Sequence, residues 1–245
     1  MRHDLVIVGG GITGCEAAYA TARAGLSTLL VTTSLDTLYA LAHDVYELEV
    51  PGGSLLAACV GRSGAVRVRA PEVRRAAKRL LEAEPRVHLL QSTASRLMVE
   101  NGVVAGVDTW EGIARHGALV ALCVGSFLGA RLTVGASEEH AGRLSEMAYD
   151  DLLHDLVGRG FEFQDEELAL DGLAGALPYV VRFRVLARRE WAEATYRLGR
   201  SEGLYAAGAC VGRFGYATAV TDGMALGSVL VGAFSASAGR QPRCS

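Results

Sequence analysis

A glycine-rich turn between a buried strand and a helix constrains the fold of this chain more than any other feature. The apolar run at residues 5–8 is typical of a strand buried in a parallel sheet, and it ends at Gly9-Gly10-Gly11-Ile12-Thr13-Gly14. An alanine-rich stretch follows, which favours a helix that ends at Gly25. A second apolar run occupies residues 28–31. Strand, turn, helix and strand within about 30 residues have the size of a βαβ unit.

The spacing Gly9-x-Gly11-x-x-Gly14 predicts a phosphate site for a dinucleotide. In such turns the first glycine permits the tight turn, the second lets a pyrophosphate approach the backbone, and the third lets the helix lie close to the sheet. The free N–H groups and the dipole at the start of the helix then face the phosphates. Because a strand precedes the motif and a helix follows it, the sequence favours a nucleotide site over a tight turn without a ligand.

The remaining patterns predict a Rossmann-like α/β fold, with a parallel sheet flanked by helices and an antiparallel β-meander. Helices are expected at residues 71–84, 150–159, 190–198 and 217–234. Strands are expected at 87–90, 97–99, 103–109, 119–124, 179–186 and 203–208, and a loop at 135–146. No repeat or low-complexity linker marks a boundary. We therefore expect one domain over residues 1–245, with a small inserted region at roughly 135–200.

Composition excludes several classes of protein. The net charge of −3 disfavours a surface that seeks nucleic acid, so DNA is not an expected partner. We expect no membrane span and no secretory signal, because the apolar runs are short and no basic segment precedes one. The five cysteines are odd in number and lack CxxC spacing, which disfavours disulfides and structural zinc and favours the cytoplasm. The histidines show no metal spacing, so no metal is expected.

Three stretches leave alternatives open. Residues 38–69 are either a loop that faces a substrate or flavin, or a plain surface excursion. The arginines between Arg62 and Arg79 form a basic stretch, which we interpret as a solvated face rather than a binding surface. The second strand ends in Thr32, Thr33 and Ser34, where an NAD site usually carries an acidic residue for the ribose. That absence disfavours a plain NAD-dependent dehydrogenase.

Several segments, in chain order, resemble the GidA/MnmG family of FAD proteins, which modify the wobble uridine of tRNA. The run from Gly9 to Ala18 resembles the family's opening, where a GCEAA-like sequence follows the glycines. Segments 28–32 and 35–37 resemble its second strand and the turn that follows. Segments 99–107 and 124–129 resemble its meander and its "GTFL" strand end. Residues 203–208, followed by Gly215 and Tyr216, resemble its closing flavin-binding strand. The resemblance implies a FAD-binding Rossmann-like fold.

The chain also departs from this family. Longer members carry a Cys-Asn-Pro-Ala-Ile-Gly-Gly loop after the second strand, whereas residues 42–53 here contain no cysteine. The family's arginine- and threonine-rich loop is replaced by Gln164-Asp165-Glu166-Glu167. The large insertion and helical C-terminal region that serve tRNA and the partner GTPase have no counterpart in 245 residues. The resemblance therefore implies FAD binding more directly than it implies tRNA chemistry.

Carried onto this sequence, the resemblance implies a non-covalent FAD site. The glycine turn would hold the pyrophosphate, the end of the second strand would face the adenosine ribose, and the start of the meander would lie beside the adenine. The strand end at 125 would close over the adenosine, residues 208–209 would pass the ribityl chain, and residues 216–219 would approach the isoalloxazine. The full set is Gly9, Gly10, Gly11, Ile12, Thr13, Gly14, Thr32, Thr33, Ser34, Thr93, Ala94, Gly125, Ser126, Gly208, Ala209, Tyr216, Ala217, Thr218 and Ala219.

The function favoured by these observations is an FAD-dependent oxidoreductase, with NADH or NADPH as the candidate electron donor. The alternative is a flavin-binding module without turnover in a tRNA-modifying assembly, and a plain NAD-dependent dehydrogenase is less favoured. Alone, the chain is expected to bind tRNA weakly. Catalytic residues, substrate and oligomeric state are not specified by the sequence. Cys210 and Cys59 are candidates for redox chemistry, but we interpret them as inert thiols.

Overall fold

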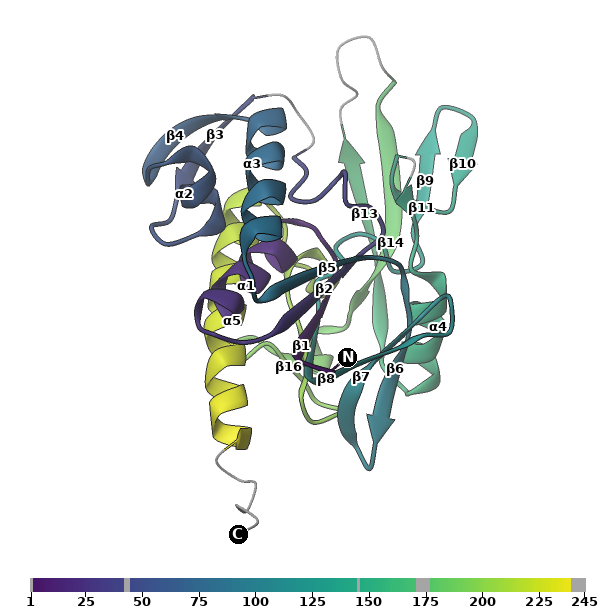
Figure 1. The fold of residues 1–245 in the computed structure, drawn as a ribbon. Coiled ribbons are helices and arrows are strands. Elements are labelled where there is room, and N and C mark those ends of the chain that lie inside the picture. Colours follow the sequence, from purple (N-terminus) through teal and green to yellow (C-terminus); the bar gives the residue numbers. More distant parts are fainter. Residues whose placement is uncertain (1, 42–44, 145, 171–176, 239–245) are drawn as a thin grey trace.

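A mixed sheet of nine strands lies at the centre of the fold (Figure 1). The computed structural model describes residues 2–41, 45–144, 146–170 and 177–238. The parallel part has the order β17 (Leu204–Ala206), β8 (Ala114–Leu122), β1 (Arg2–Val8), β2 (Thr28–Thr32) and β5 (Val87–Gln91). Strands β2 and β5 lie on one side of β1, and strands β8 and β17, which come later in the chain, lie on the other side. The carboxyl end of β1 is therefore the switch point of the sheet, where ligands of open α/β folds bind.

Alternate side chains of the central strands supply two cores, one on each face of the sheet. Leu5 and Ile7 pack with α1 (Ile12–Arg23), α3 (Ala70–Ala83) and α5 (Tyr216–Ala238). Val6 and Val8 pack with the meander strands β6 (Ala94–Glu100) and β7 (Val103–Thr109) and with α4 (Asp150–Gly158). Figure 1 shows α1 and α5 on one side of the sheet and α4 on the other. The Rossmann-like fold class predicted from the sequence is confirmed.

Strand β8 begins earlier than the sequence predicts, because it serves two partners. Its first residues pair antiparallel with β7, and the rest of the strand runs parallel to β1. The meander is thereby joined directly to the main sheet. The prediction of a separate strand beginning at 119 missed this earlier start.

The helix α5 corrects one sequence expectation. Residues Tyr216–Ser237 are long and apolar enough to cross a membrane, with a mean hydropathy of 1.4, although we expected no such segment. One side of this helix packs closely on α1, where Gly223 and Gly227 face the backbone and small side chains of that helix. Leu226 and Leu230 are fully buried in the same interface. This contact accounts for the buried side of α5, which makes up 33% of the apolar window.

A second sheet has the order β10 (Ser137–Glu139), β9 (Arg131–Val134), β14 (Tyr179–Leu186) and β13 (Phe163–Leu170). Beside it, β11 (Ala141–Arg143) and β12 (Glu146–Met147) form a two-stranded ribbon. The expectation of a loop at 135–146 was therefore wrong. Strands of two or three residues are too short to show a period of two in the sequence.

The expected helix at 190–198 was also wrong. A 3₁₀ turn at Arg188–Glu190 leads into β15 (Trp191–Ala192), and β16 (Arg197–Leu198) returns antiparallel to it. Tyr196, just before β16, has a left-handed φ of 56°, which is incompatible with a right-handed α-helix at this position. The two strands extend the main sheet beyond β17.

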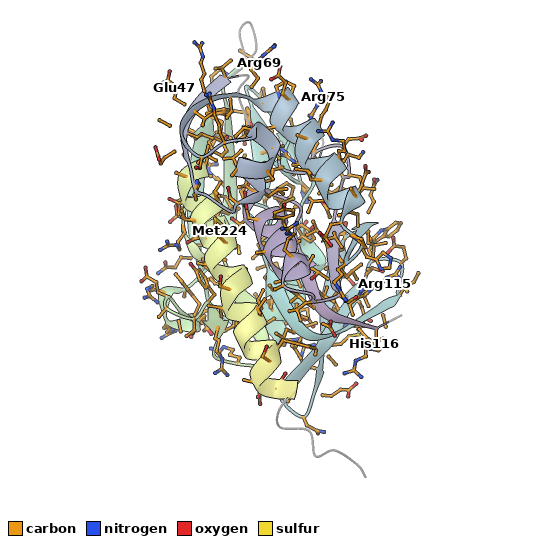
Figure 2. The ribbon with its side chains drawn as sticks, turned by 60° about the vertical axis from the view of Figure 1, so that its left-hand side comes forward. Glu47, Arg69, Arg75, Arg115, His116 and Met224 are labelled. Carbon is orange, nitrogen blue, oxygen red and sulfur yellow. The ribbon has the colours of Figure 1, made fainter. Side chains whose placement is uncertain are left out.

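Residues 45–69 form a hairpin with a short helix in its connection. Strand β3 (Val45–Val50) pairs antiparallel with β4 (Gly64–Arg69), and α2 (Leu55–Val60) lies between them in the chain. Residues 42–44 of the open stretch lie outside the described residues. The arginines between Arg62 and Arg79 are exposed, as interpreted from the sequence, and Figure 2 shows Arg69 and Arg75 projecting from this region.

Candidate nucleotide-binding site

The glycine turn after β1 has the geometry that its spacing predicts. Gly9 has a φ of 112° and lies against the Cys123 carbonyl, so a side chain there would collide with backbone. Gly14 lies equally close to the Gly9 carbonyl. Gly11, in contrast, has an extended conformation and open space where a Cβ would stand. The first and third glycines are thus required by the fold, whereas the second borders space that a ligand can use.

The start of α1 carries no side-chain cap. Gly11 is its N-cap residue, and the first turn contains no acidic residue. The N–H groups of a first helical turn lack intrahelical acceptors, and the helix dipole makes this end positive. The end of α1 at the switch point therefore suits an anion such as a pyrophosphate.

The end of β2 lies beneath the glycine turn. A Cβ at Gly10 would stand 2.5 Å from Thr32 Oγ1, and the Thr32 hydroxyl donates to the Ser34 carbonyl at 3.3 Å. The Thr33 hydroxyl points to a carboxylate from a distant part of the chain, at 3.5 Å from Glu146 Oε2. The hydroxyls predicted to face a ribose thus already have protein partners.

The residues predicted beside the adenosine lie at the same end of the sheet. Ser92 donates its backbone N–H to the Thr32 carbonyl at 2.9 Å, which places Thr93 and the start of β6 next to the end of β2. Gly125 follows β8 with a φ of 58°, and the Ser126 hydroxyl donates to the Gly142 carbonyl at 3.0 Å. These predicted residues therefore lie together at the carboxyl end of the parallel strands β1, β2, β5 and β8.

A residue near the end of the chain meets the start of α1. Gly208 has a φ of 80°, and a Cβ there would stand 2.8 Å from Thr13 Oγ1. It begins the 3₁₀ turn Gly208–Val211 that follows β17, and Ala209 is its next residue. Two predicted segments about 195 residues apart are thus in contact, as a single elongated ligand requires.

The first turn of α5 contains the four predicted residues 216–219 and meets a side chain that the sequence did not indicate. Tyr216 and Tyr46 are in edge-to-face contact, with ring centroids 4.9 Å apart. Their hydroxyls lie 3.3 Å from each other. Tyr46 comes from β3, so the hairpin at 45–69 packs on the start of α5. The alternation of polar and apolar residues in Glu47-Leu48-Glu49-Val50 was the available sequence signal for this strand.

Glu16, one turn into α1, is fully buried and holds three segments together. Its carboxylate accepts hydrogen bonds from the Tyr39 hydroxyl and from the backbone N–H groups of Leu55 and Leu56, the latter at 2.7 and 2.9 Å. Burial raises the pKa of this carboxyl, although the three donors act in the opposite direction. The carboxylate therefore fixes α2 and the segment after β2 against the first turns of α1, next to the glycine turn.

Comparison with known proteins places this geometry in a family. The family model described as glucose inhibited division protein A matches residues 4–43 and 60–167. The GidA-related protein from Thermus thermophilus is 40% identical, with a TM-score of 0.85 over 95% of this chain and 99% of that chain. The chain belongs to the GidA family.

Longer relatives share only part of their length with this GidA-family chain. The tRNA uridine 5-carboxymethylaminomethyl modification enzyme MnmG of Chlamydia felis is 34% identical over an alignment of 189 residues, which covers 66% of this chain and 31% of that protein. The chain thus matches about a third of the curated relatives' length. GidA of Aquifex aeolicus has the same fold, with a TM-score of 0.81 and 16% identity over 96% of this chain and 64% of that chain.

Cys210 and Cys59 of this GidA-family chain lie in surroundings that disfavour a reactive thiolate. Cys210 is fully buried, and its thiol donates to the carbonyls of Leu122 and Ala207. Burial raises the pKa of the Cys210 thiol to about 12, and it raises that of the half-buried Cys59 to about 12 as well. A protonated, enclosed thiol is a poor nucleophile. This geometry supports the interpretation of both residues as inert, while Cys244 lies outside the described residues.

Proposed function

We propose that this chain is a flavoprotein that binds FAD non-covalently and acts as an FAD-dependent oxidoreductase. The contact between Gly208 and Thr13 is the observation that carries the proposal. It joins the turn after β17 to the phosphate-binding end of α1, beside the open space at Gly11. Membership of the GidA family supports the same cofactor.

In this proposal each end of the site has a separate role. The N–H groups at Gly11, Ile12 and Thr13 bind the pyrophosphate, and residues 208–209 offer backbone groups to the ribityl chain. The first turn of α5, with Tyr216, lies where the isoalloxazine ring would reach. When bound, the flavin would supply the electron transfer, while the protein orients and encloses it. NADH or NADPH is the proposed electron donor, and the cytoplasm is the proposed location.

The second candidate is a flavin-binding module without turnover of its own, within a tRNA-modifying assembly. The absence of cysteine from the described residues 45–53 and the burial of Cys210 favour it. Anaerobic titration with NADH and NADPH distinguishes the two functions. Bleaching of the flavin band at about one equivalent supports the oxidoreductase, whereas no reduction by either donor favours the module.

The Gly11→Val variant tests the cofactor proposal. Its Cβ would enter the space beside the phosphate site but meet no protein atom, so the fold should persist while FAD binding falls at least tenfold. Gly52→Val is the matched control, because Gly52 also has open space around it but lies in the β3–α2 connection. The measurements are the absorption spectrum and FAD titration of the stripped protein. Wild-type protein that is colourless and takes up no added FAD would contradict the proposal.

A further inference from the structure

Glu146 brings a carboxylate to the end of β2 from a remote part of the chain. It lies on the ribbon strand β12 and is only 9% exposed. The Thr37 hydroxyl donates to its Oε2 at 3.1 Å, and the Thr33 hydroxyl donates to the same oxygen at 3.5 Å. Thr33 is the first residue after β2. The carboxylate therefore stands beside the position at which dinucleotide-binding folds place the acidic residue for the ribose.

Asp36, the acidic residue nearest in sequence to β2, does not fill this role. Its side chain is 93% exposed and forms an ion pair with Lys78 on α3 at 3.1 Å. The segment Thr32-Thr33-Ser34 has no carboxylate of its own. Among the described residues, Glu146 is thus the carboxylate bonded to the first residue after β2.

The two oxygens of Glu146 have different surroundings. Arg143, from the facing ribbon strand, donates its Nε–H to Oε1 at 2.6 Å. Among the described residues, Oε2 receives only hydroxyl donors, and the longer of these two bonds, from Thr33, is at the limit of hydrogen-bond distance. An ionised carboxylate oxygen accepts about two hydrogen bonds, and a ligand hydroxyl can replace a long one.

The ribbon that carries Glu146 is fixed to the same edge of the sheet. The Gly142 carbonyl accepts the Ser126 hydroxyl at 3.0 Å, in the segment after β8. A side chain at Gly142 would collide with the Phe127 ring, so this strand lies directly on that segment. Tyr149, just after the ribbon, donates its N–H to the Phe127 carbonyl at 2.8 Å. The ribbon therefore connects the ends of β8 and β2.

We propose that Glu146 is the ribose-binding carboxylate of the nucleotide site, supplied by the β11–β12 ribbon instead of by β2. This inference rests on the proposed FAD function. Oε2 would accept a hydrogen bond from the ribose diol of the adenosine in place of the long bond from Thr33. The site would then favour a free ribose over a ribose without hydroxyls, and it would repel a 2′-phosphate because both groups are negative.

The experiment uses the whole 245-residue chain, stripped of bound flavin, and three probes: FAD, ADP and 2′,3′-dideoxy-ADP. Calorimetric titration should show that the wild type binds ADP about tenfold or more tightly than the dideoxy analogue, as a hydrogen bond to a charged acceptor implies. In Glu146→Gln, ADP binding should fall toward that of the analogue, while binding of the analogue stays unchanged. Glu139→Gln, on the exposed strand β10, is the control and should retain the wild-type preference.

The results of these titrations separate the role of Glu146 from the proposed FAD function. If Glu146 only holds the β11–β12 ribbon in place, Glu146→Gln will weaken the binding of ADP and of its dideoxy analogue equally. That result would overturn the inference. A wild type that binds FAD but does not distinguish ADP from the analogue overturns it without any variant. A wild type that binds neither FAD nor ADP overturns the proposed function too.

Discussion

Arg213 and Asp222 form a bidentate ion pair that connects the loop after Gly208 to α5. The guanidinium donates from Nε to Oδ2 at 2.7 Å and from Nη2 to Oδ1 at 2.8 Å. The Tyr196 hydroxyl, from the β15–β16 hairpin, donates to the same Oδ1 at 3.1 Å. Asp222 is 2% exposed, whereas about a third of the Arg213 side chain reaches solvent. The pair thus sets the position of the segments proposed to meet the ribityl chain and the flavin ring.

The two halves of this pair should differ in their effect on stability. In Arg213→Ala the buried Asp222 carboxylate keeps Tyr196 as its only partner among the described residues, so we expect the free energy of unfolding to fall by about 3 kcal/mol. Adding Asp222→Asn to Arg213→Ala should recover part of this loss, because the uncompensated charge is removed. Urea unfolding of the single and double variants measures both values.

Arg182→Ala is the matched control for this prediction. Arg182 and Glu167 form an exposed pair at 2.7 Å between β14 and β13, and such pairs contribute at most about 1 kcal/mol. Equal losses for Arg182→Ala and Arg213→Ala would show that the Arg213–Asp222 pair has no special structural role.

Two glycines of α5 should respond in opposite directions to substitution by alanine. A Cβ at Gly223 would stand 2.5 Å from Glu16 Cβ and 2.6 Å from the Thr13 carbonyl oxygen. Gly223→Ala must therefore separate α1 from α5, and we expect a loss of about 1–3 kcal/mol. Gly232 has open space around it, and Gly232→Ala should stabilise the helix by about 0.5–1 kcal/mol. Thermal unfolding of both variants tests whether the close α1–α5 contact leaves no room for a side chain, and a neutral Gly223→Ala would contradict this.

Cys210 should remain unreactive in the native protein. Because burial raises the pKa of its thiol to about 12, the thiolate is scarce at pH 8. Iodoacetamide at that pH should modify Cys210 only on unfolding, and Cys210→Ala should leave the flavin spectrum and reduction by NAD(P)H nearly unchanged. Peptide mass mapping of native and urea-treated protein measures this. Rapid native labelling of Cys210 that FAD slows would instead identify a reactive thiol beside the cofactor.

The first 34 residues were the most predictable part of the fold, and the reason is local. A buried strand, a turn that requires glycine at Gly9 and Gly14, and an alanine-rich helix each leave a pattern within a few residues. The observed elements β1, α1 and β2 follow the predicted ones closely. The antiparallel pairing of β6 and β7 was equally readable, because a glycine turn at 102 separates two apolar runs.

The parts that could not be predicted depend on contacts between distant segments. The strands β11, β12, β15 and β16 each have two or three residues and gain their order from a partner strand. Glu146 illustrates the consequence for the site. Its partner Thr33 lies 113 residues away, and a single sequence contains no signal that joins them. The same holds for Tyr46 and Tyr216, which are 170 residues apart.

Binding of tRNA to this chain alone should be weak and strongly dependent on salt. Arg62, Arg67 and Arg69 line a hollow beside α3 and are exposed, but the chain has a net charge of −3. Phosphate contacts by these side chains would release counterions, so the affinity should fall steeply between 50 and 200 mM salt. Arg67→Gln should reduce the salt slope by about one, whereas Arg189→Gln, on the β14–β15 connection, should not. Filter binding with bulk tRNA measures the slope, and tight binding that persists at high salt would contradict the prediction.

The buried Glu16 should make stability fall with rising pH over the acidic range. Because burial raises its pKa above the ordinary 4.5, the folded protein retains a proton that the unfolded chain has released. The contribution is therefore fully present below about pH 4.5 and is lost as the pH rises through the raised pKa, by about 1.4 kcal/mol for each pH unit that separates the folded pKa from the unfolded one. Glu16→Gln removes the titration, so its free energy of unfolding should lack this decline between pH 4 and 7. Glu47→Gln, at the exposed edge seen in Figure 2, is the control and should follow the wild type. If Glu16→Gln and the wild type keep a constant difference in unfolding free energy across this range, folding does not raise the pKa of Glu16, and its three donors offset its burial.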